Sequence, residues 1–183
     1  MDLGCLSALR RRQRRGLLSR EEYLCKAAAR SGQLEELKVL RADGCPWSDW
    51  TCWGAADGGH LEVLQWLRAK SCPWDERTCR LAAGGGHLEI LRWAHSNGCP
   101  FDKKTRAWAA REGHLEVLQW LRANGCPWNE ETCESAAEGG HLETLQWAHS
   151  NGCPWDRRTC SHATKRRQLK VWKWAKANGC PMK

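Results

Sequence analysis

The amino-acid sequence predicts an all-α solenoid of six stacked helix-turn-helix units, and three observations indicate this fold class. A Cys-Pro dipeptide recurs every 27 residues from Cys45 to Cys180. A second marker, His-Leu-Glu, keeps the same interval from His60 to His141. Within each interval, small and apolar residues follow helical spacing and leave room only for turns. A fixed period of this kind is typical of arrays in which each unit buries its apolar face against its neighbours.

The repeat divides the chain into a basic N-terminal arm, residues 1–17, and one repeat domain, residues 18–183. The six units of this domain begin near residues 18, 45, 72, 99, 126 and 153. The arm contains the run Arg-Arg-Arg-Gln-Arg-Arg from Arg10 to Arg15. Such a run is a solvated arm, a patch for nuclear import or for an acidic partner, or a transit peptide. Asp2 and the small number of hydroxyl residues argue against the transit peptide.

The unit at residues 72–98 shows why each helix is expected. Asp75 follows the Cys-Pro-Trp entry and suits the N-cap of a first helix. The small residues from Cys79 to Gly86 are spaced i, i+3, i+4 and i+7, which places them on one helical face. Glycine then allows a tight break before a second helix from His87 to about Asn97, where Asn-Gly ends it. No strand is expected.

Tryptophan and cysteine are abundant because the repeat multiplies them. Nine of the 13 tryptophans occupy two columns of the repeat, and we expect them to form a stacked core between units rather than a ligand cage. Eleven of the 12 cysteines occupy two further columns. Stacked helices lie about 8 to 10 Å apart, beyond the roughly 7 Å Cα separation that a disulfide allows. The sequence therefore predicts buried, reduced thiols.

The net charge of +8 is unevenly distributed. Residues 1–20 carry a net charge of +5, and residues 157–183 carry nine Lys or Arg and no acidic residue. Subtracting these from the total leaves −6 for residues 21–156. No stretch approaches the roughly 18 to 20 apolar residues of a membrane span, so no membrane is expected as a partner. The opening residues do not form a signal peptide, which favours a cytoplasmic or nuclear protein.

Cysteine and histidine raise the possibilities of a metal site and of a catalytic pair, but the repeat explains both residue types. Most full units place two cysteines seven residues apart and a histidine eight residues further on, whereas zinc sites use closer pairs. The residues of a catalytic site should lie outside the repeat columns. Only a few cysteines and histidines lie outside the two cysteine columns and the His-Leu-Glu marker: Cys5, His95, His149 and His162. We expect no catalytic residue, no metal ligand and no cofactor.

The informative positions are those that the repeat does not fix, on the side of the first helix away from its buried face and on the flanks. They are aromatic and acidic in the second unit, basic and aromatic in the fourth, acidic in the fifth and basic in the sixth. Such variation is typical of a recognition surface. A solvated helix face whose residues vary without any function would show the same variation. The candidate partner-binding residues are Asp49, Trp50, Trp53, Asp57, Glu76, Arg77, Arg80, Lys103, Lys104, Trp108, Arg111, Glu130, Glu131, Glu134, Glu138, Arg157, Arg158 and Lys165.

Two stretches resemble ankyrin repeats. The segment from Ala55 to Leu64 is similar to the family's two alanines, two variable residues, Gly-His, any residue, Glu and two valines or leucines. The segment from Leu121 to Gly125 resembles the end of the family's second helix. The units here are shorter than the family's roughly 33 residues, with the deficit at its β-turn loop. Trp50-Thr51-Cys52-Trp53 also replaces the family's Thr-Pro-Leu-His. The resemblance implies a loop-trimmed ankyrin-like array over residues 18–180.

The resemblance also implies a non-catalytic scaffold whose partner is another protein. The alternative is binding of nucleic acid or another polyanion through the basic terminal segments, because phosphate contacts need clustered Lys and Arg. The acidic middle of the chain argues against this alternative. The sequence does not identify the partner.

Overall fold

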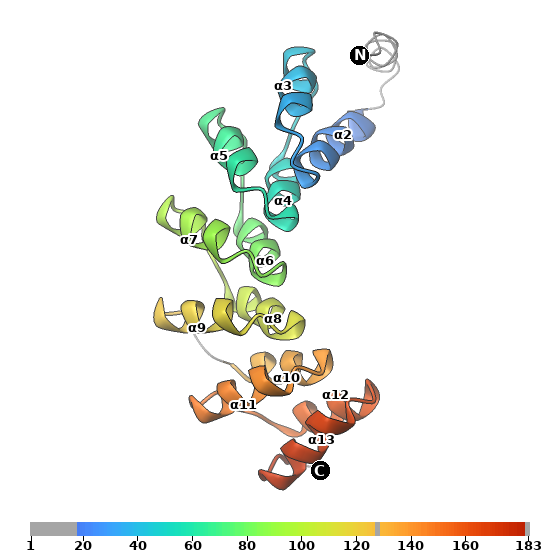
Figure 1. Ribbon diagram of the computed structural model, residues 1–183, viewed down its shortest axis with the longest axis vertical. Helices are drawn as coiled ribbons and strands as arrows, with labels where there is room; N and C mark the ends of the chain where they lie inside the picture. The colour runs from blue at the N-terminus through green and yellow to red at the C-terminus, as the bar shows by residue number, and fades with distance from the viewer. Residues whose placement is uncertain (1–17, 127–128, 182–183) are drawn as a thin grey trace. The chain divides into compact units, whose positions relative to one another are not determined.

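The computed structural model describes residues 18–126 and 129–181, and these residues form helices and turns without a strand (Figure 1). The predicted basic arm, residues 1–17, lies outside the described residues. None of the described helices combines the length and the apolar character required to cross a bilayer. In chain order, the helices are α2 (Leu18–Arg30), α3 (Leu34–Ala42), α4 (Asp49–Gly58), α5 (Leu61–Ala69), α6 (Glu76–Gly84), α7 (Leu88–Ser96), α8 (Lys103–Glu112), α9 (Leu115–Ala123), α10 (Glu130–Gly139), α11 (Leu142–Ser150), α12 (Arg157–Lys165) and α13 (Leu169–Ala177).

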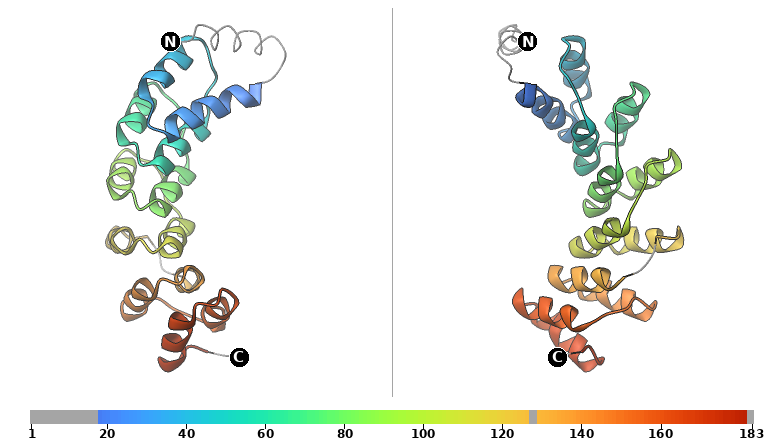
Figure 2. Two further views of the ribbon diagram at one scale, coloured as in Figure 1. Left: turned by 45° about the vertical axis from the view of Figure 1, so that its right-hand side comes forward. Right: turned by 180° about the vertical axis from the view of Figure 1, so that it is seen from behind.

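The chain forms two compact units, one ending at Thr78 and the other beginning at Cys79, inside α6. In the first unit α2 packs against α4, and the helix pairs are α2 with α3 and α4 with α5. In the second unit α10 packs between α8 and α12, while α9, α11 and α13 pair with these first helices (Figure 2). The predicted class, an α-solenoid of stacked helix-turn-helix repeats, is confirmed. That residues 18–183 form a single domain stays a prediction.

Helix ends lie where the sequence signals predict them. His87 and Asn97 flank α7 as its N-cap and C-cap residues, in agreement with the expected second helix. Asp102 caps α8 by accepting a hydrogen bond from the Thr105 backbone N–H, and the Thr105 side chain completes a capping box. Asp156 caps α12 in a related way. Short polar side chains after the Cys-Pro entry therefore begin the first helices.

The cysteine columns hold the repeats together as thiols. All eleven described cysteines are buried. The Sγ atom of Cys72 donates a hydrogen bond to the carbonyl oxygen of Ser48 at 3.4 Å, and Cys153 donates to Asn129 at 3.5 Å. In both cases the acceptor is the N-cap residue of the preceding unit. The predicted reduced thiols thus satisfy carbonyl groups at first-helix N-termini as well as filling space.

The His-Leu-Glu marker has a structural role. His60 Nε2 donates a hydrogen bond to the Arg30 carbonyl oxygen at 3.0 Å, and His114 Nε2 does the same to Gly84 at 2.9 Å. Each imidazole therefore binds a carbonyl group at the end of the preceding first helix, where the helix itself supplies no donor. The ring also covers a glycine with positive φ, since a Cβ on Gly113 would lie 2.4 Å from the His141 ring.

The tryptophan columns contact the preceding unit, but their rings are half-buried and do not belong to the buried core. Two pairs of rings meet edge to face within one repeat, with 5.7 Å between the centroids of Trp47 and Trp66 and 5.8 Å between Trp155 and Trp174. The second helix of the preceding repeat contacts Trp47 through the Arg41 guanidinium, which lies 4.2 Å from the ring. These rings lie at the rim of the contact between repeats, and small and aliphatic residues fill the centre.

One core position departs from the repeat. Arg106 stands in the column that holds cysteine in every other unit, and its side chain is fully buried in α8. Burial lowers the pKa of the Arg106 guanidinium, because the charged form loses its hydration. Burial also raises the pKa of the nearby Cys126 thiol, and Arg106 opposes that rise. The fourth repeat therefore carries a cation within its packed interior.

Candidate functional site

The eighteen candidate positions given above, the variable columns, all lie on the first helices. Seventeen of them are exposed or half-exposed. Trp53 is the exception, because only 8% of its surface is exposed. Its indole Nε1 donates a 2.7 Å hydrogen bond to Asp75 of the next repeat, and Arg77 lies 4.8 Å from its ring. Trp53 therefore offers little surface to a partner, because its flank position turns the ring toward the neighbouring repeat.

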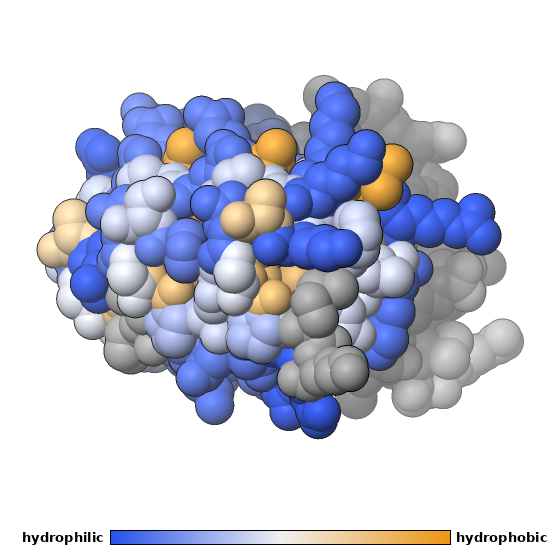
Figure 3. All heavy atoms as spheres, turned by 90° about the horizontal axis from the view of Figure 1, so that it is seen from below, coloured by the Kyte–Doolittle hydropathy of each residue, from blue (hydrophilic) through white to orange (hydrophobic). Residues whose placement is uncertain are grey.

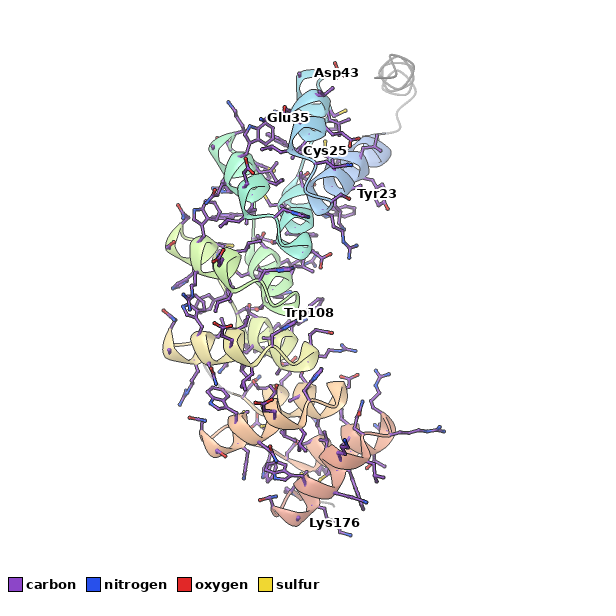
Figure 4. All side chains as sticks on the ribbon, in the orientation of Figure 1. Tyr23, Cys25, Glu35, Asp43, Trp108 and Lys176 are labelled. Atoms are coloured by element: carbon purple, nitrogen blue, oxygen red, sulfur yellow. The ribbon has the colours of Figure 1, made fainter. Side chains whose placement is uncertain are left out.

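An aromatic and cationic surface lies on α2 and α4 in the N-terminal unit. Tyr23 is 60% exposed and Trp50 is 45% exposed. The Trp50 ring stacks on Trp53 with 6.1 Å between centroids, and Lys26 Nζ lies 5.6 Å from it. Figure 4 shows Tyr23 on the outer side of α2. The sequence did not indicate Tyr23 as a candidate, because the candidate positions began in the second repeat. Tyr23 nevertheless precedes Trp50 by one repeat length.

Several polar candidates form pairs between neighbouring repeats. Arg30 Nε lies 2.9 Å from Asp57 Oδ2 in the N-terminal unit. In the C-terminal unit Arg80 binds Asp102 through two nitrogen atoms, at 2.6 and 3.1 Å. Burial raises the pKa of Asp102, but the Arg80 guanidinium and the Thr105 hydrogen bonds together hold it below its ordinary value. Asp57 and Arg80 are thus engaged within the array.

Glu138 on α10 is the most connected of these side chains. Its carboxylate lies 2.5 Å from Arg166, 3.4 Å from Arg111 and 3.8 Å from the imidazole of His162. The Arg166 hydrogen bond is the main reason why the pKa of Glu138 lies below its ordinary value. The carboxylate joins α8, α10 and the end of α12. The sequence pattern did not predict Arg166 and His162 as its partners.

An open hollow of about 510 Å³ lies between α10 and α12. Burial, followed by the nearby Asp156 carboxylate, raises the pKa of Glu134 in its wall. Arg158 reduces the negative charge there, with 3.7 Å between its guanidinium and Glu134. The lining residues are Asn129, Glu130, Glu131, Glu134, Trp155, Asp156 and Arg158. Glu130 is exposed at the rim, where a partner's cation could reach it.

The charges of the C-terminal unit alternate from helix to helix. Lys103 and Lys104 are exposed on α8, the glutamates follow on α10, and Arg157 and Lys165 are exposed on α12. A second, smaller hollow of about 180 Å³ lies beside Trp108, which is 44% exposed on α8 (Figure 4). The three packed helices therefore present cationic, anionic and cationic side chains in succession.

The histidines outside the repeat columns are used in packing. His95 lies 4.5 Å from the Phe101 ring, and His149 stacks on Trp155 with 3.8 Å between ring centroids. Among the described residues, no group of three or more His, Cys, Asp or Glu side chains is placed to hold a metal ion. Cys5 lies outside the described residues.

Comparison with known proteins identifies the fold. No protein-family model matches this chain. No curated protein matches it either. Among solved structures the chain is similar to the human ASB11 ankyrin repeat domain, with a TM-score of 0.67 over 85% of this chain and 83% of that chain, at 16% identity. The chain has the ankyrin-repeat fold, as its resemblance predicts.

Proposed function

We propose, on the premise of its ankyrin-repeat fold, that this chain is a non-catalytic scaffold that binds another protein through the variable columns of its first helices. Repeat arrays of this kind present extended surfaces to their partners. Packing between neighbouring repeats within each compact unit fixes the backbone positions of the exposed side chains. Binding a partner therefore needs little change in the backbone. The proposal concerns the class of partner, which is protein.

The observation that carries the proposal is the exposure of large aromatic side chains on first helices. Tyr23, Trp50 and Trp108 are 60%, 45% and 44% exposed. Tryptophan and tyrosine are enriched among the residues that dominate binding energy at protein interfaces. A partner that covers them would remove apolar surface from water.

Two groups stand out among the polar candidates. The first group forms ion pairs with neighbouring repeats, so replacing its members would disturb the array itself; it comprises Asp57, Arg80, Arg111, Glu134, Glu138 and Arg158. A second group is exposed or half-exposed and forms no inter-repeat ion pair among the described residues. It comprises Lys103, Lys104, Glu130, Glu131, Arg157 and Lys165. Specificity for a partner is expected from this second group, which supplies both signs of charge.

The test uses three purified variants in affinity capture followed by mass spectrometry. The first replaces Tyr23, Trp50 and Trp108 by alanine, and the second combines Glu130→Lys with Glu131→Lys. The control combines Val39→Ala with Glu116→Lys, because both side chains are exposed on second helices. The aromatic variant should lose the partners of the unaltered protein, and the charge variant should lose a subset of them.

Circular dichroism and thermal melting establish that each variant is folded before capture. Loss of partners by the control alone would place the binding surface on the second helices and refute the proposal. Retention of every partner by the aromatic variant would refute it as well.

The alternative function, binding of nucleic acid through the basic terminal segments, is distinguished by titration with duplex DNA and RNA at two salt concentrations. Tight binding with a steep salt dependence would favour the alternative. The arginine run belongs to residues outside the described ranges. The proposal expects weak binding that moderate salt abolishes.

A further inference from the structure

Three columns of the first helices reverse their charge from one repeat to the next within the C-terminal unit. They run over α8, α10 and α12, of which α10 packs between the other two. Each column holds a cation on α8, a glutamate on α10 and a cation on α12. The columns are Lys103, Glu130 and Arg157; Lys104, Glu131 and Arg158; and Arg111, Glu138 and Lys165. The order cation, anion, cation is therefore shared by several positions of these helices.

The third column is engaged within the array, because Glu138 lies 3.4 Å from Arg111 and is bound by Arg166. In the first two columns, Arg158 lies 3.7 Å from Glu134 of the preceding repeat. The other five side chains take part in no ion pair among the residues that the structure describes. They are Lys103, Lys104, Glu130, Glu131 and Arg157. Their alternating charges do not neutralise one another and are left for the charges of a partner.

These five side chains are open to solvent, since four are exposed and Glu131 is half-buried. Glu130 is exposed although α10 has a first helix on each side of it, so its exposure is not that of a terminal helix. Figure 3 views the C-terminal unit from its α12 and α13 end and shows hydrophilic side chains over most of that face. The charged groups of the two columns are therefore accessible to a second molecule.

The anionic middle of this surface borders the open hollow of about 510 Å³ between α10 and α12. The wall of the hollow carries four carboxylates and one guanidinium. Glu130 and Glu131 lie on its α10 side, and the Trp155 ring lines it as well. A guanidinium or ammonium group can bind carboxylates and contact an aromatic ring at the same time. The hollow therefore fits a cationic side chain, whereas Lys103 and Arg157 on either side of it fit acidic ones.

The spacing of the columns identifies the form of a matching segment. Packed helices lie about 8 to 10 Å apart. On an α-helix, side chains seven residues apart lie on one face and about 10.5 Å apart, and those three or four residues apart share that face, so each interval offers two charges to the two columns. An extended strand turns side chains about 10 Å apart to opposite faces. A polyproline helix offers only one side chain for each turn of about 9 Å.

We propose that the charge-alternating surface, formed by Lys103, Lys104, Glu130, Glu131 and Arg157, binds an α-helix of the protein partner that crosses α8, α10 and α12. The charged side chains of that helix follow the order acidic, basic, acidic at intervals of seven residues. The acidic groups meet the cations of α8 and α12, and the basic group enters the hollow. This inference rests on the proposed function and specifies its partner. Nucleic acid does not fit, because its uniform negative charge is repelled by α10.

Fluorescence anisotropy with three labelled helical peptides tests the charge order. The first peptide carries a Glu pair, a Lys pair and a Glu pair at intervals of seven residues, and the second contains the same residues in the order basic, acidic, acidic. The third keeps the first order at intervals of five residues, which turns the charges to different faces. At low ionic strength, the unaltered chain should bind the first peptide about tenfold or more tightly than either of the others.

The matched protein variant exchanges the charges of α8 and α10 without changing the net charge: Lys103→Glu, Lys104→Glu, Glu130→Lys and Glu131→Lys. It should prefer the second peptide by about tenfold or more. The control exchanges four exposed charges on second helices and should keep the preference of the unaltered chain: Glu116→Lys, Glu143→Lys, Lys170→Glu and Lys173→Glu. Circular dichroism checks the fold of each. Lys103→Gln with Lys104→Gln, a milder change, should weaken binding of the first peptide about threefold or more.

Equal binding of the first and second peptides by the unaltered chain would overturn the proposal. So would an exchanged variant that still prefers the first peptide, equal binding of the third peptide, or no saturable binding of the first peptide at about 1 mM. Each of these results leaves the capture experiment untouched. Loss of partners by the aromatic variant would then still support the proposed function, so the failure of this inference is distinguishable from the failure of that function.

Discussion

Replacing Glu138 by glutamine tests whether the variable columns hold the repeats together. The carboxylate is bound by Arg166 at 2.5 and 3.1 Å and faces Arg111 at 3.4 Å. Its own side chain is 19% exposed, but the two guanidinium side chains are 57% and 51% exposed, so solvent screens each pair. At about 0.5 kcal/mol for each such pair, Glu138→Gln should lower the free energy of unfolding by about 1 kcal/mol at neutral pH.

The pH dependence has a definite sign. The pKa of Glu138 lies below its ordinary value in the folded state, chiefly because of Arg166. A lowered folded-state pKa contributes stability above the ordinary pKa of about 4.3, and that contribution is lost as the pH falls through the lowered value. The unaltered protein should therefore be more stable at pH 7, and the difference should shrink below about pH 4.

Urea denaturation followed by circular dichroism, repeated at several pH values, measures this difference. A double-mutant cycle with Arg166→Gln should give a coupling energy of about 0.5 to 1 kcal/mol. Identical stability at pH 7, or a difference that does not change between pH 7 and pH 3, would refute the role assigned to Glu138.

Three further changes test the packing, each by chemical denaturation. Gly113→Ala should cost about 1 to 3 kcal/mol more than Gly125→Ala, because both have positive φ but only the Cβ at Gly113 meets His141; equal losses would contradict the contact. Trp120→Ala should cost about 2 to 3 kcal/mol, below the value for a fully buried ring, since the ring is half-buried; a loss above 4 would contradict that position. Arg106→Cys should raise stability by about 1 to 3 kcal/mol by removing a buried cation, and a loss would count against the expected effect.

The sequence predicted the helices well because the repeat displays each signal several times. His87, Asn97 and Asp102 lie at the helix ends where capping rules place them. The position of the Trp rings was predicted less well, since periodicity gives the column of a residue but not the direction in which its side chain leans. Trp53 shows this limit: one flank of the helix turns toward solvent and the other toward the next repeat. The sequence does not indicate which flank of the helix faces the next repeat, whereas the structure shows it.

Contacts that join several helices could not be predicted from the sequence either. Glu138 pairs with a residue 28 positions later, one more than the repeat length, so a comparison of equivalent columns does not find Arg166.

The two kinds of contact between repeats have different consequences for the order of the units. The histidine bonds to carbonyl groups and the alanine and leucine core recur in the inner units, so they would accept almost any inner unit as a neighbour. The polar pairs between repeats, by contrast, depend on the residues of the two repeats that they join and are not found between every pair of neighbours. Deleting residues 99–125 would leave the core contacts intact but would bring Arg80 opposite Asn129 instead of Asp102. The succession of units in this array is thus encoded mainly on its surface, and a shuffled chain could pack yet be less stable than the natural order.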